Sequence, residues 1–161
     1  MFENEKLTTE QFVAEYKGEV ALLLKYLPWL EAKNGRNVVS QYTPDSATEH
    51  TMRIPTYDGT LLAFVKCADK TKFINRNYDY MYRKHRMNTA EDELRMIARA
   101  RIQDMDLLGA ILSKYIIKGR TKGMMWKEGV ENGVFCALVN KMKELIEFWD
   151  VPYAESTGED A

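Results

Sequence analysis

Residues 104–119 read DMDLLGAILSKYIIKG, and this stretch decides the fold. Large apolar side chains recur in it at spacings of three and four residues: Leu107, Leu108, Ile111, Leu112, Tyr115 and Ile116. That spacing places one broad apolar face along an α-helix. Gly119 then supplies the residue type that commonly ends a helix. The stretch predicts a helix whose apolar face must be covered by the rest of the chain.

Two further helices are predicted on its C-terminal side. Residues 134–149, VFCALVNKMKELIEFW, carry a second long apolar face, and residues 121–133, TKGMMWKEGVENG, form a short helix bounded by glycines. Short turns of this kind resemble a helix-turn-helix motif. The last helix, however, would repel a phosphate backbone about as much as attract it, because it carries Lys141, Lys143, Glu144 and Glu147. We therefore expect a packed three-helix unit.

The N-terminal half also follows helical spacing. A helix is predicted from about residue 9, where Thr8-Thr9-Glu10-Gln11 has the form of a capping box. Pro28 should kink or restart it, and it should end near Ala32. Residues 59–74 form another helix, residues 75–86 a turn or short helix, and residues 90–101 a helix capped by Asn88-Thr89.

The expected fold class is mainly α: a compact multi-helix domain of about five to six helices, with one small β-hairpin or extended segment around residues 37–57. Pro55 excludes its second strand from the centre of a larger sheet. A chain of 161 residues with 45% hydrophobic residues suits one core. We expect a single helical domain over residues 1–152 and a flexible acidic tail over residues 153–161.

The segment IPTYDGTLL, residues 54–62, resembles the nucleophile loop of haloacid-dehalogenase-type phosphatases. That loop needs Asp-x-Asp-Gly-Thr, and position 56 is Thr, so the attacking carboxylate is missing. No alternating series of strands and helices exists to carry such a loop. Asp58 is therefore interpreted as the N-cap of a helix beginning at Gly59.

Catalytic, cofactor and metal motifs are absent from the sequence. His50 and His85 are isolated, and Cys67 and Cys136 lie far apart without metal-ligand spacing, which favours reduced thiols. We expect no catalytic residue, no cofactor and no metal site. The alternative is an enzyme of unknown class, which would need a pocket that joins His85, Glu91, Asp92 and the tyrosines. A mixed metal site of His85 with Glu91 or Glu93 would need the same convergence.

The segment from Lys72 to Arg86 has an unusual composition, with five Lys or Arg against one acid and three interleaved tyrosines. Cations that follow phosphates and rings that stack on bases suit single-stranded nucleic acid. The candidate binding residues are Arg76, Tyr78, Tyr80, Tyr82, Arg83, Lys84 and Arg86. The competing interpretation is structural: Tyr78 and Tyr82, four residues apart, pack inward while the cations form a solvated face.

A candidate protein interface lies at Met124, Met125 and Trp126. These large apolar side chains lie in a short helix between glycines, which cannot easily bury them all. We expect a protein partner or self-association as a homo-oligomer. No secretory leader or apolar run of membrane-spanning length is seen, so a cytoplasmic location and no membrane partner are expected.

Several strings resemble a family of small uncharacterised bacterial proteins, a domain of unknown function often found near mobile-element genes. They include LLKYLPWLEAKNG, YDGTLLAFV, RNYDYMYRKHRMNTAEDE and MKELIEFWD, and the resemblance covers about residues 20–152. It brings no catalytic residues with it. It implies a mobile-element or defence setting, in which small non-enzymatic binding proteins are common. The function expected from the sequence is a non-enzymatic interaction protein, with nucleic-acid binding through residues 72–86 as the alternative.

Overall fold

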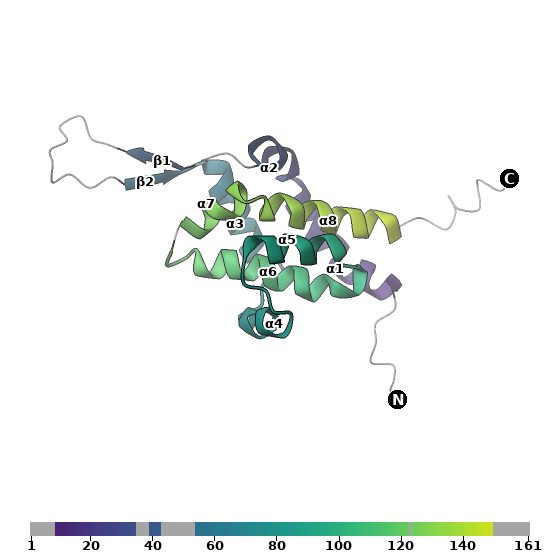
Figure 1. Ribbon diagram of the computed structural model, residues 1–161. Coiled ribbons are helices and arrows are strands. Elements are labelled where there is room, and N and C mark those ends of the chain that lie inside the picture. Colours follow the sequence, from purple (N-terminus) through teal and green to yellow (C-terminus); the bar gives the residue numbers. More distant parts are fainter. Residues whose placement is uncertain (1–8, 35–38, 43–53, 123, 150–161) are drawn as a thin grey trace.

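A computed structural model of the protein describes residues 9–34, 39–42, 54–122 and 124–149 (Figure 1). Within these residues the chain forms eight α-helices, one 3₁₀ turn (Ile102–Asp104) and two short strands. The elements are α1 (Thr9–Leu24), α2 (Leu27–Lys33), β1 (Val39–Tyr42), β2 (Ile54–Tyr57), α3 (Gly59–Asp69), α4 (Tyr78–Lys84), α5 (Ala90–Arg99), α6 (Met105–Lys118), α7 (Met124–Glu131) and α8 (Val134–Trp149).

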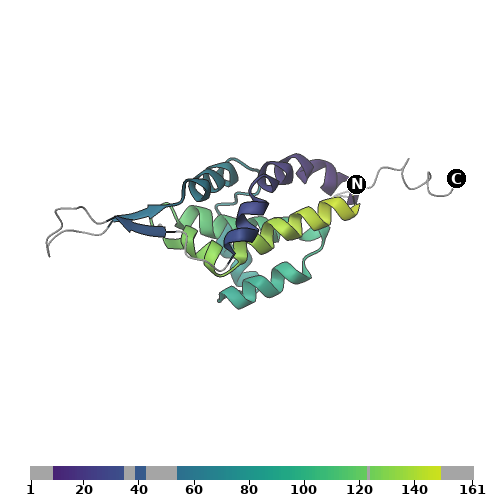
Figure 2. The same cartoon turned by 90° about the horizontal axis from the view of Figure 1, so that it is seen from above.

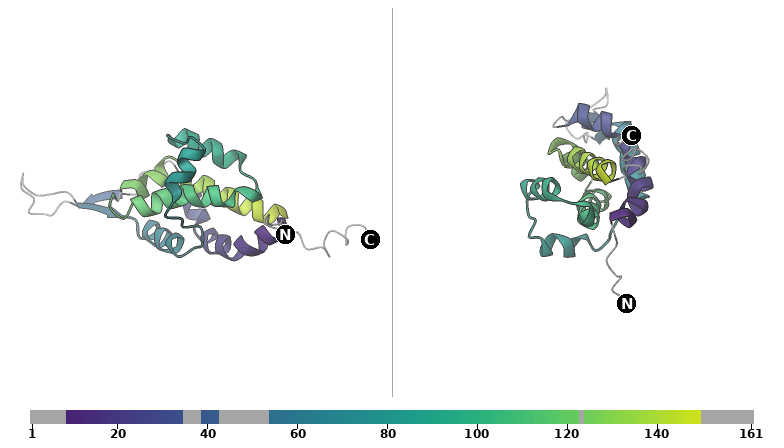
Figure 3. Two further views of the ribbon diagram at one scale, coloured as in Figure 1. Left: turned by 90° about the horizontal axis from the view of Figure 1, so that it is seen from below. Right: turned by 90° about the vertical axis from the view of Figure 1, so that its right-hand side faces the viewer.

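The helices form layers around α6 and α8. Viewed end-on, α6 and α8 lie in the middle, with α1 on one side and α4 and α5 on the other (Figure 3). Helix α3 lies on the same side as α1 (Figure 2), and α2 packs on α8. The predicted unit of α6, α7 and α8 is present, since each of these helices packs against the other two. Helix α6 is the most enclosed, with ten of its 14 residues buried.

The helix count exceeds the prediction of five to six because the N-terminal helix is divided and the tyrosine-rich segment is helical. Pro28 has no N–H to give to the carbonyl of Leu24, so α1 ends at Leu24 and α2 begins at Leu27 with the proline in its first turn. The segment predicted as a turn or short helix contains the seven-residue helix α4. Both short helices pack on longer ones, which explains how they form despite their length.

The predicted extended segment at residues 37–57 contains the strands β1 and β2. They pair antiparallel, with Val39 opposite Tyr57 and Tyr42 opposite Ile54. Among the described residues the sheet has these two strands alone, so Pro55 does not interrupt a central strand. The pair projects from one end of the helical body (Figure 2). The remaining residues of that segment, and the predicted acidic tail at 153–161, lie outside the described residues.

Asp58 caps α3, as predicted. Its carboxylate accepts a hydrogen bond from the backbone N–H of Thr60 at 2.7 Å. The helix ends at Asp69, earlier than expected, because the backbone N–H groups of Lys70 and Thr71 bond three residues back, to Cys67 and Ala68, and tighten the last turn. Asp58 therefore has a structural role at a helix terminus.

The connection after α3 crosses α6 at a notch formed by two small residues. A Cβ on Gly109 would lie 2.8 Å from the carbonyl oxygen of Phe73, so only glycine admits the backbone there. One turn later the buried hydroxyl of Ser113 donates to the carbonyl of Gly109 at 2.7 Å and accepts from the backbone N–H of Asn75 at 2.7 Å. The notch ties the chain entering α4 to the middle of α6.

Gly119 follows α6, as predicted, but its φ of −64° needs no glycine. Glycine is needed here for a steric reason, because a Cβ at this position would overlap the indole ring of Trp126. The ring lies across the end of α6, and its Nε1–H donates to the carbonyl of Ile116 at 3.3 Å. Gly119 therefore lets α7 fold closely back onto α6.

Candidate functional site

The polar centre of the molecule begins at the N-terminus of α5. Thr89 is the N-cap, and its hydroxyl accepts from the backbone N–H of Asp92 at 3.1 Å. The Asp92 carboxylate accepts in turn from the backbone N–H groups of Asn88 and Thr89. These two hydrogen bonds, together with the nearby Arg95, hold the pKa of Asp92 below its usual value. This reciprocal capping box fixes where α5 begins.

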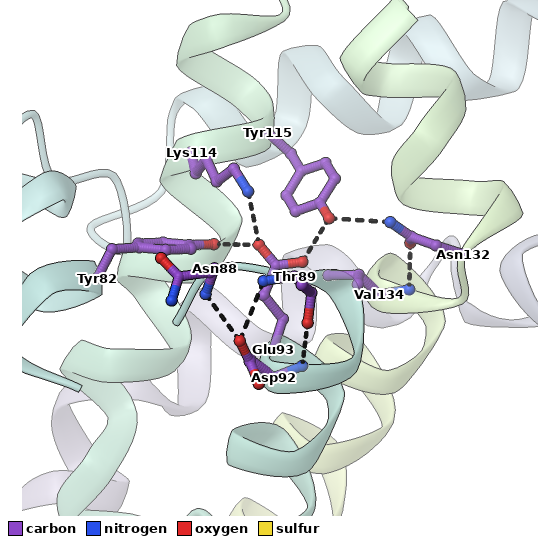
Figure 4. Close-up of polar contacts among 9 residues, drawn as sticks. All are labelled: Tyr82, Asn88, Thr89, Asp92, Glu93, Lys114, Tyr115, Asn132 and Val134. Atoms are coloured by element: carbon purple, nitrogen blue, oxygen red, sulfur yellow. Dashed lines mark hydrogen bonds and ion pairs between the residues drawn. The ribbon is translucent and has the colours of Figure 1, made fainter. Parts of the chain in front are cut away.

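Glu93, the next residue, points into the protein and is completely buried. Its carboxylate accepts hydrogen bonds from the hydroxyl of Tyr82 at 2.6 Å and from the hydroxyl of Tyr115 at 2.5 Å (Figure 4). It also pairs with the ammonium group of Lys114 at 2.9 Å. Donors from α4 and α6 therefore converge on one carboxylate from α5, which ties three helices together.

The groups around Glu93 are themselves held in place. The Lys114 ammonium lies 4.9 Å from the ring centre of Tyr82 and 5.3 Å from that of Tyr115. Asn132 donates to the hydroxyl oxygen of Tyr115 at 2.9 Å. Among the described residues, no buried side-chain nitrogen or oxygen lacks a hydrogen-bond partner. Satisfaction of this kind is typical of a polar network that fixes the packing of a core.

Both tyrosines remain protonated. Burial, followed by the negative charge of Glu93, raises the pKa of Tyr82 far above its usual value. Burial and the hydrogen bond to Glu93 raise the pKa of Tyr115 in the same direction. Each hydroxyl therefore acts as a hydrogen-bond donor to the carboxylate throughout the physiological pH range.

A pocket of about 530 Å³, which we call the basic pocket, opens beside this network, between α4 and the C-terminal half of α6. Its lining residues are Asp79, Tyr82, Arg83, Arg86, Met87, Asn88, Lys114 and Lys118. Lys114 therefore belongs to both sites, since it pairs with Glu93 on one side and lines the pocket on the other.

The cations of the basic pocket have few competing partners. Within the described part of the chain, Arg83, Arg86 and Lys118 form no ion pair, and all three are exposed. Asp79 is the single acidic residue in the lining, and it too is exposed. The pocket therefore presents a concentrated positive charge to the solvent.

Arg86 has an unusual backbone conformation, with φ at +54°. It follows α4, where its N–H bonds to the carbonyl of Arg83 and the N–H of Met87 bonds to the carbonyl of Tyr82. This is the Schellman arrangement, in which the left-handed position is usually glycine because a Cβ there costs about 1–2 kcal/mol. The chain places an arginine at this costly position, and its side chain lines the basic pocket.

The predicted nucleic-acid-binding residues do not form one surface in the structure. Tyr78 and Tyr82 are buried against α6 and have no ring face available for a base, as the structural interpretation expected. Tyr80 is 52% exposed on the outer face of α4, where the Lys84 ammonium lies 6.0 Å from its ring centre. Arg76 is exposed outside the pocket lining, and Arg83 and Arg86 lie within it.

The sequence did not single out Lys114 or Lys118 as site residues, and it offered Glu93 only as a possible metal ligand beside His85. The two lysines are four residues apart on α6 and share one helix face, which is the signal that could have singled them out. Glu93 was interpreted as part of an acidic first turn that suits the helix dipole. Only the contacts of its side chain with Tyr82 of α4 and with Lys114 and Tyr115 of α6 show that this carboxylate is internal.

The enzyme and metal arrangements that the sequence left as alternatives do not coincide with the basic pocket. The basic pocket contains Tyr82 but none of His85, Glu91 and Asp92. Among the described residues, no group of three or more His, Cys, Asp or Glu side chains could hold a metal ion. Glu93 is enclosed by its own donors, and His50 lies outside the described residues.

The predicted interface residues differ in exposure. Met124 is 46% exposed, whereas Met125 and Trp126 are half-buried and pack against the core. Trp126 also lines an apolar groove of about 500 Å³ between α3, α6 and α7. The wall of this groove includes Leu62, which is 43% exposed, and an ion pair between Arg120 and Asp69.

These features define a small helical protein with a basic pocket supported by a buried glutamate network. The chain belongs to a family of unknown function, DUF6508, which matches residues 16–148. No curated protein and no solved structure matches it. None of the helices among the described residues has the length and apolar character needed to cross a membrane.

Proposed function

We propose that this protein is a non-catalytic binding protein, and that the basic pocket holds a phosphate group of its ligand. The observation that carries the proposal is Arg86. Helix dipoles favour bases in last turns, which accounts for Arg83 in α4 and Lys118 in α6 without any ligand. Arg86 lies beyond the helix in a conformation that favours glycine, so its side chain needs another explanation.

A bound phosphate supplies that explanation. Guanidinium groups form paired, charge-assisted hydrogen bonds to phosphate oxygens, and lysines add point charges. Arg83, Arg86 and Lys118 line one concave surface, and none of them forms an ion pair with another described residue. Lys114 is held at the pocket by Glu93, so little side-chain freedom remains to be lost when a ligand binds.

The Glu93 network supports binding over catalysis. A general acid or base must reach the atom to which it gives or from which it takes a proton. Glu93 is completely buried and accepts from three donors, so it has neither access nor an unsatisfied oxygen.

The test is a titration with inorganic phosphate and pyrophosphate at constant ionic strength, followed by the melting temperature, since a ligand that binds the folded state raises it. We expect a saturable rise in the wild-type protein and its loss in an Arg83→Gln, Lys118→Gln double variant. Lys84→Gln is the matched control, because Lys84 is adjacent in sequence but lies beside Tyr80 on the outer face of α4. An equal rise in the double variant, or no rise in any protein, would refute the proposal.

Self-association is a second candidate function, favoured by the exposure of Leu62 in the wall of the apolar groove and of Met124 at the start of α7. A second copy could cover these side chains and part of Trp126. Light scattering at increasing concentration tests this directly. A dimer that dissociates in Met124→Glu would support it, and a monomer at high concentration would refute it.

Nucleic-acid binding through Tyr80 and Lys84 is a third candidate, favoured by the exposed ring and its adjacent ammonium. A mobility-shift titration of single-stranded oligonucleotides at two salt concentrations tests it. Binding that weakens in Tyr80→Ala and Lys84→Gln would favour this outer face over the basic pocket. The absence of a shift at the lower salt would leave it without support.

A further inference from the structure

We propose that the ligand of the basic pocket is a small phosphate monoester whose organic part donates a hydrogen bond to Asp79. This inference rests on the proposed function and makes it specific. It distinguishes the ligand from an internal phosphodiester of a nucleic acid, and from free phosphate.

The first argument is charge balance. Three cations without an ion pair in the described part of the chain, Arg83, Arg86 and Lys118, and one carboxylate, Asp79, leave two net positive charges in the pocket. Lys114 adds none, because Glu93 neutralises it. A phosphate monoester carries about −1.5 to −2 at pH 7 and would balance this charge. A phosphodiester has a single negative charge and would leave one cation uncompensated.

The second argument is size. A volume of about 530 Å³ lies within the usual range of small-molecule sites, about 300–1,000 Å³. A phosphate group alone would leave most of that volume to water. The remaining space can take an organic body such as a sugar or a nucleoside.

The third argument is the lack of stacking surfaces in the pocket. Tyr82 is the single aromatic residue of the lining, and this residue is only 8% exposed. A continuous strand of nucleic acid gains much of its affinity from bases that stack on aromatic rings. In the described region the exposed ring of α4 is Tyr80, which lies outside the lining. The pocket therefore favours an isolated phosphorylated molecule.

The fourth argument is Asp79. Its carboxylate disfavours a simple anion, but it is an acceptor for a hydroxyl or amino group on the ligand. It forms no ion pair within the described residues, so it is available for that contact. Its position in the first turn of α4 also suits the helix dipole, which is the structural effect that the experiment must separate from recognition.

The experiment is isothermal titration calorimetry on the full chain with three monoesters: phosphoserine, a hexose 6-phosphate and a nucleoside 5′-monophosphate. Each is compared with its methyl diester, with inorganic phosphate and with a single-stranded oligonucleotide. We expect at least one monoester to bind about fivefold more tightly than its diester, the upper end of the effect of one additional solvent-exposed ion pair. It should also bind more tightly than inorganic phosphate.

The Asp79→Ala variant should change the affinity for the monoester and the affinity for inorganic phosphate in opposite directions. It removes an acceptor and one negative charge, so we expect weaker binding of the preferred monoester and stronger binding of inorganic phosphate. A loss of folding alone would weaken both, and circular dichroism of the variant measures it. Arg99→Gln is the control, because Arg99 is exposed in the last turn of α5 and does not line the pocket.

The outcomes separate this inference from the proposed function. Equal binding of monoesters and diesters, or tightest binding of the oligonucleotide, would overturn the inference while the pocket remained a phosphate site. Equal losses for monoester and phosphate in a folded Asp79→Ala protein would also overturn it. If no phosphate compound binds, the proposed function itself fails.

Discussion

Replacing Arg86 by glycine should make the protein more stable and a poorer binder. Arg86 has φ at +54°, where a Cβ costs about 1–2 kcal/mol, and glycine avoids that cost. Glycine also loses more backbone freedom on folding, which offsets about 0.5–1 kcal/mol. Because the arginine side chain is exposed, little packing is lost. We expect a net gain of about 0.5–1 kcal/mol in the free energy of unfolding.

Urea denaturation followed by circular dichroism measures this gain, and for a chain of this length the melting temperature should rise by about 1–4 °C. The phosphate-dependent rise in melting temperature should fall in the same variant. Arg86→Ala separates the two effects, because it removes the guanidinium but keeps the Cβ, so binding should weaken without added stability. If Arg86→Gly lowers stability, the arginine side chain supports the fold and the argument from backbone strain is wrong.

Four further predictions concern the fold. Asp58→Ala should lower the free energy of unfolding by about 1 kcal/mol in urea denaturation, whereas Asp58→Asn should be nearly silent because Asn also caps. Glu93→Gln should cost about 3–5 kcal/mol, since it leaves a buried network without its negative charge, and a cost below 1 kcal/mol would contradict the network. Tyr115→Phe should cost about 1–3 kcal/mol at pH 7 through its lost hydrogen bonds, and an unchanged urea midpoint would show that they contribute nothing. Asp92 has a lowered pKa in the folded protein, so its contribution to the free energy of unfolding is present above its unfolded-state pKa and is lost as the pH falls through the lower folded-state pKa. Asp92→Asn should therefore flatten the pH dependence of stability below about pH 5, and an unchanged profile would refute this.

The long helices could be predicted from the sequence because their evidence is local. Apolar spacing defines α6 and α8, and Thr89 and Asp58 mark the starts of α5 and α3 with side chains that bond their own backbone. The division of the first helix followed from Pro28, although the sequence left open whether the proline kinks or restarts it. Local chemistry was sufficient wherever one segment satisfies its own hydrogen bonds.

The site could be predicted only in part, because it depends on contacts between segments far apart in the sequence. Arg83 and Arg86 were identified by composition, but their partners in the pocket are Lys114 and Lys118, from a different helix. Glu93 has the same local pattern whether it faces water or two tyrosines. The conformation of Arg86 was also not predictable, since arginine carries no preference for positive φ.

The notch in α6, at Gly109 and Ser113, sets the distance between the two walls of the basic pocket. Ser113 holds the backbone at Asn75, three residues before α4 begins, and Lys114 is its immediate neighbour on α6. One wall of the pocket is α4, whose preceding chain is bonded to Ser113, and the other wall is α6, whose lysine Lys114 follows Ser113 directly. Sliding α6 along its axis by one turn would move Lys114 by about 5.4 Å and would also detach Asn75. The spacing of the two walls therefore depends on the hydrogen bond between Ser113 and the backbone of Asn75, and losing that bond would free the chain that enters α4 from α6.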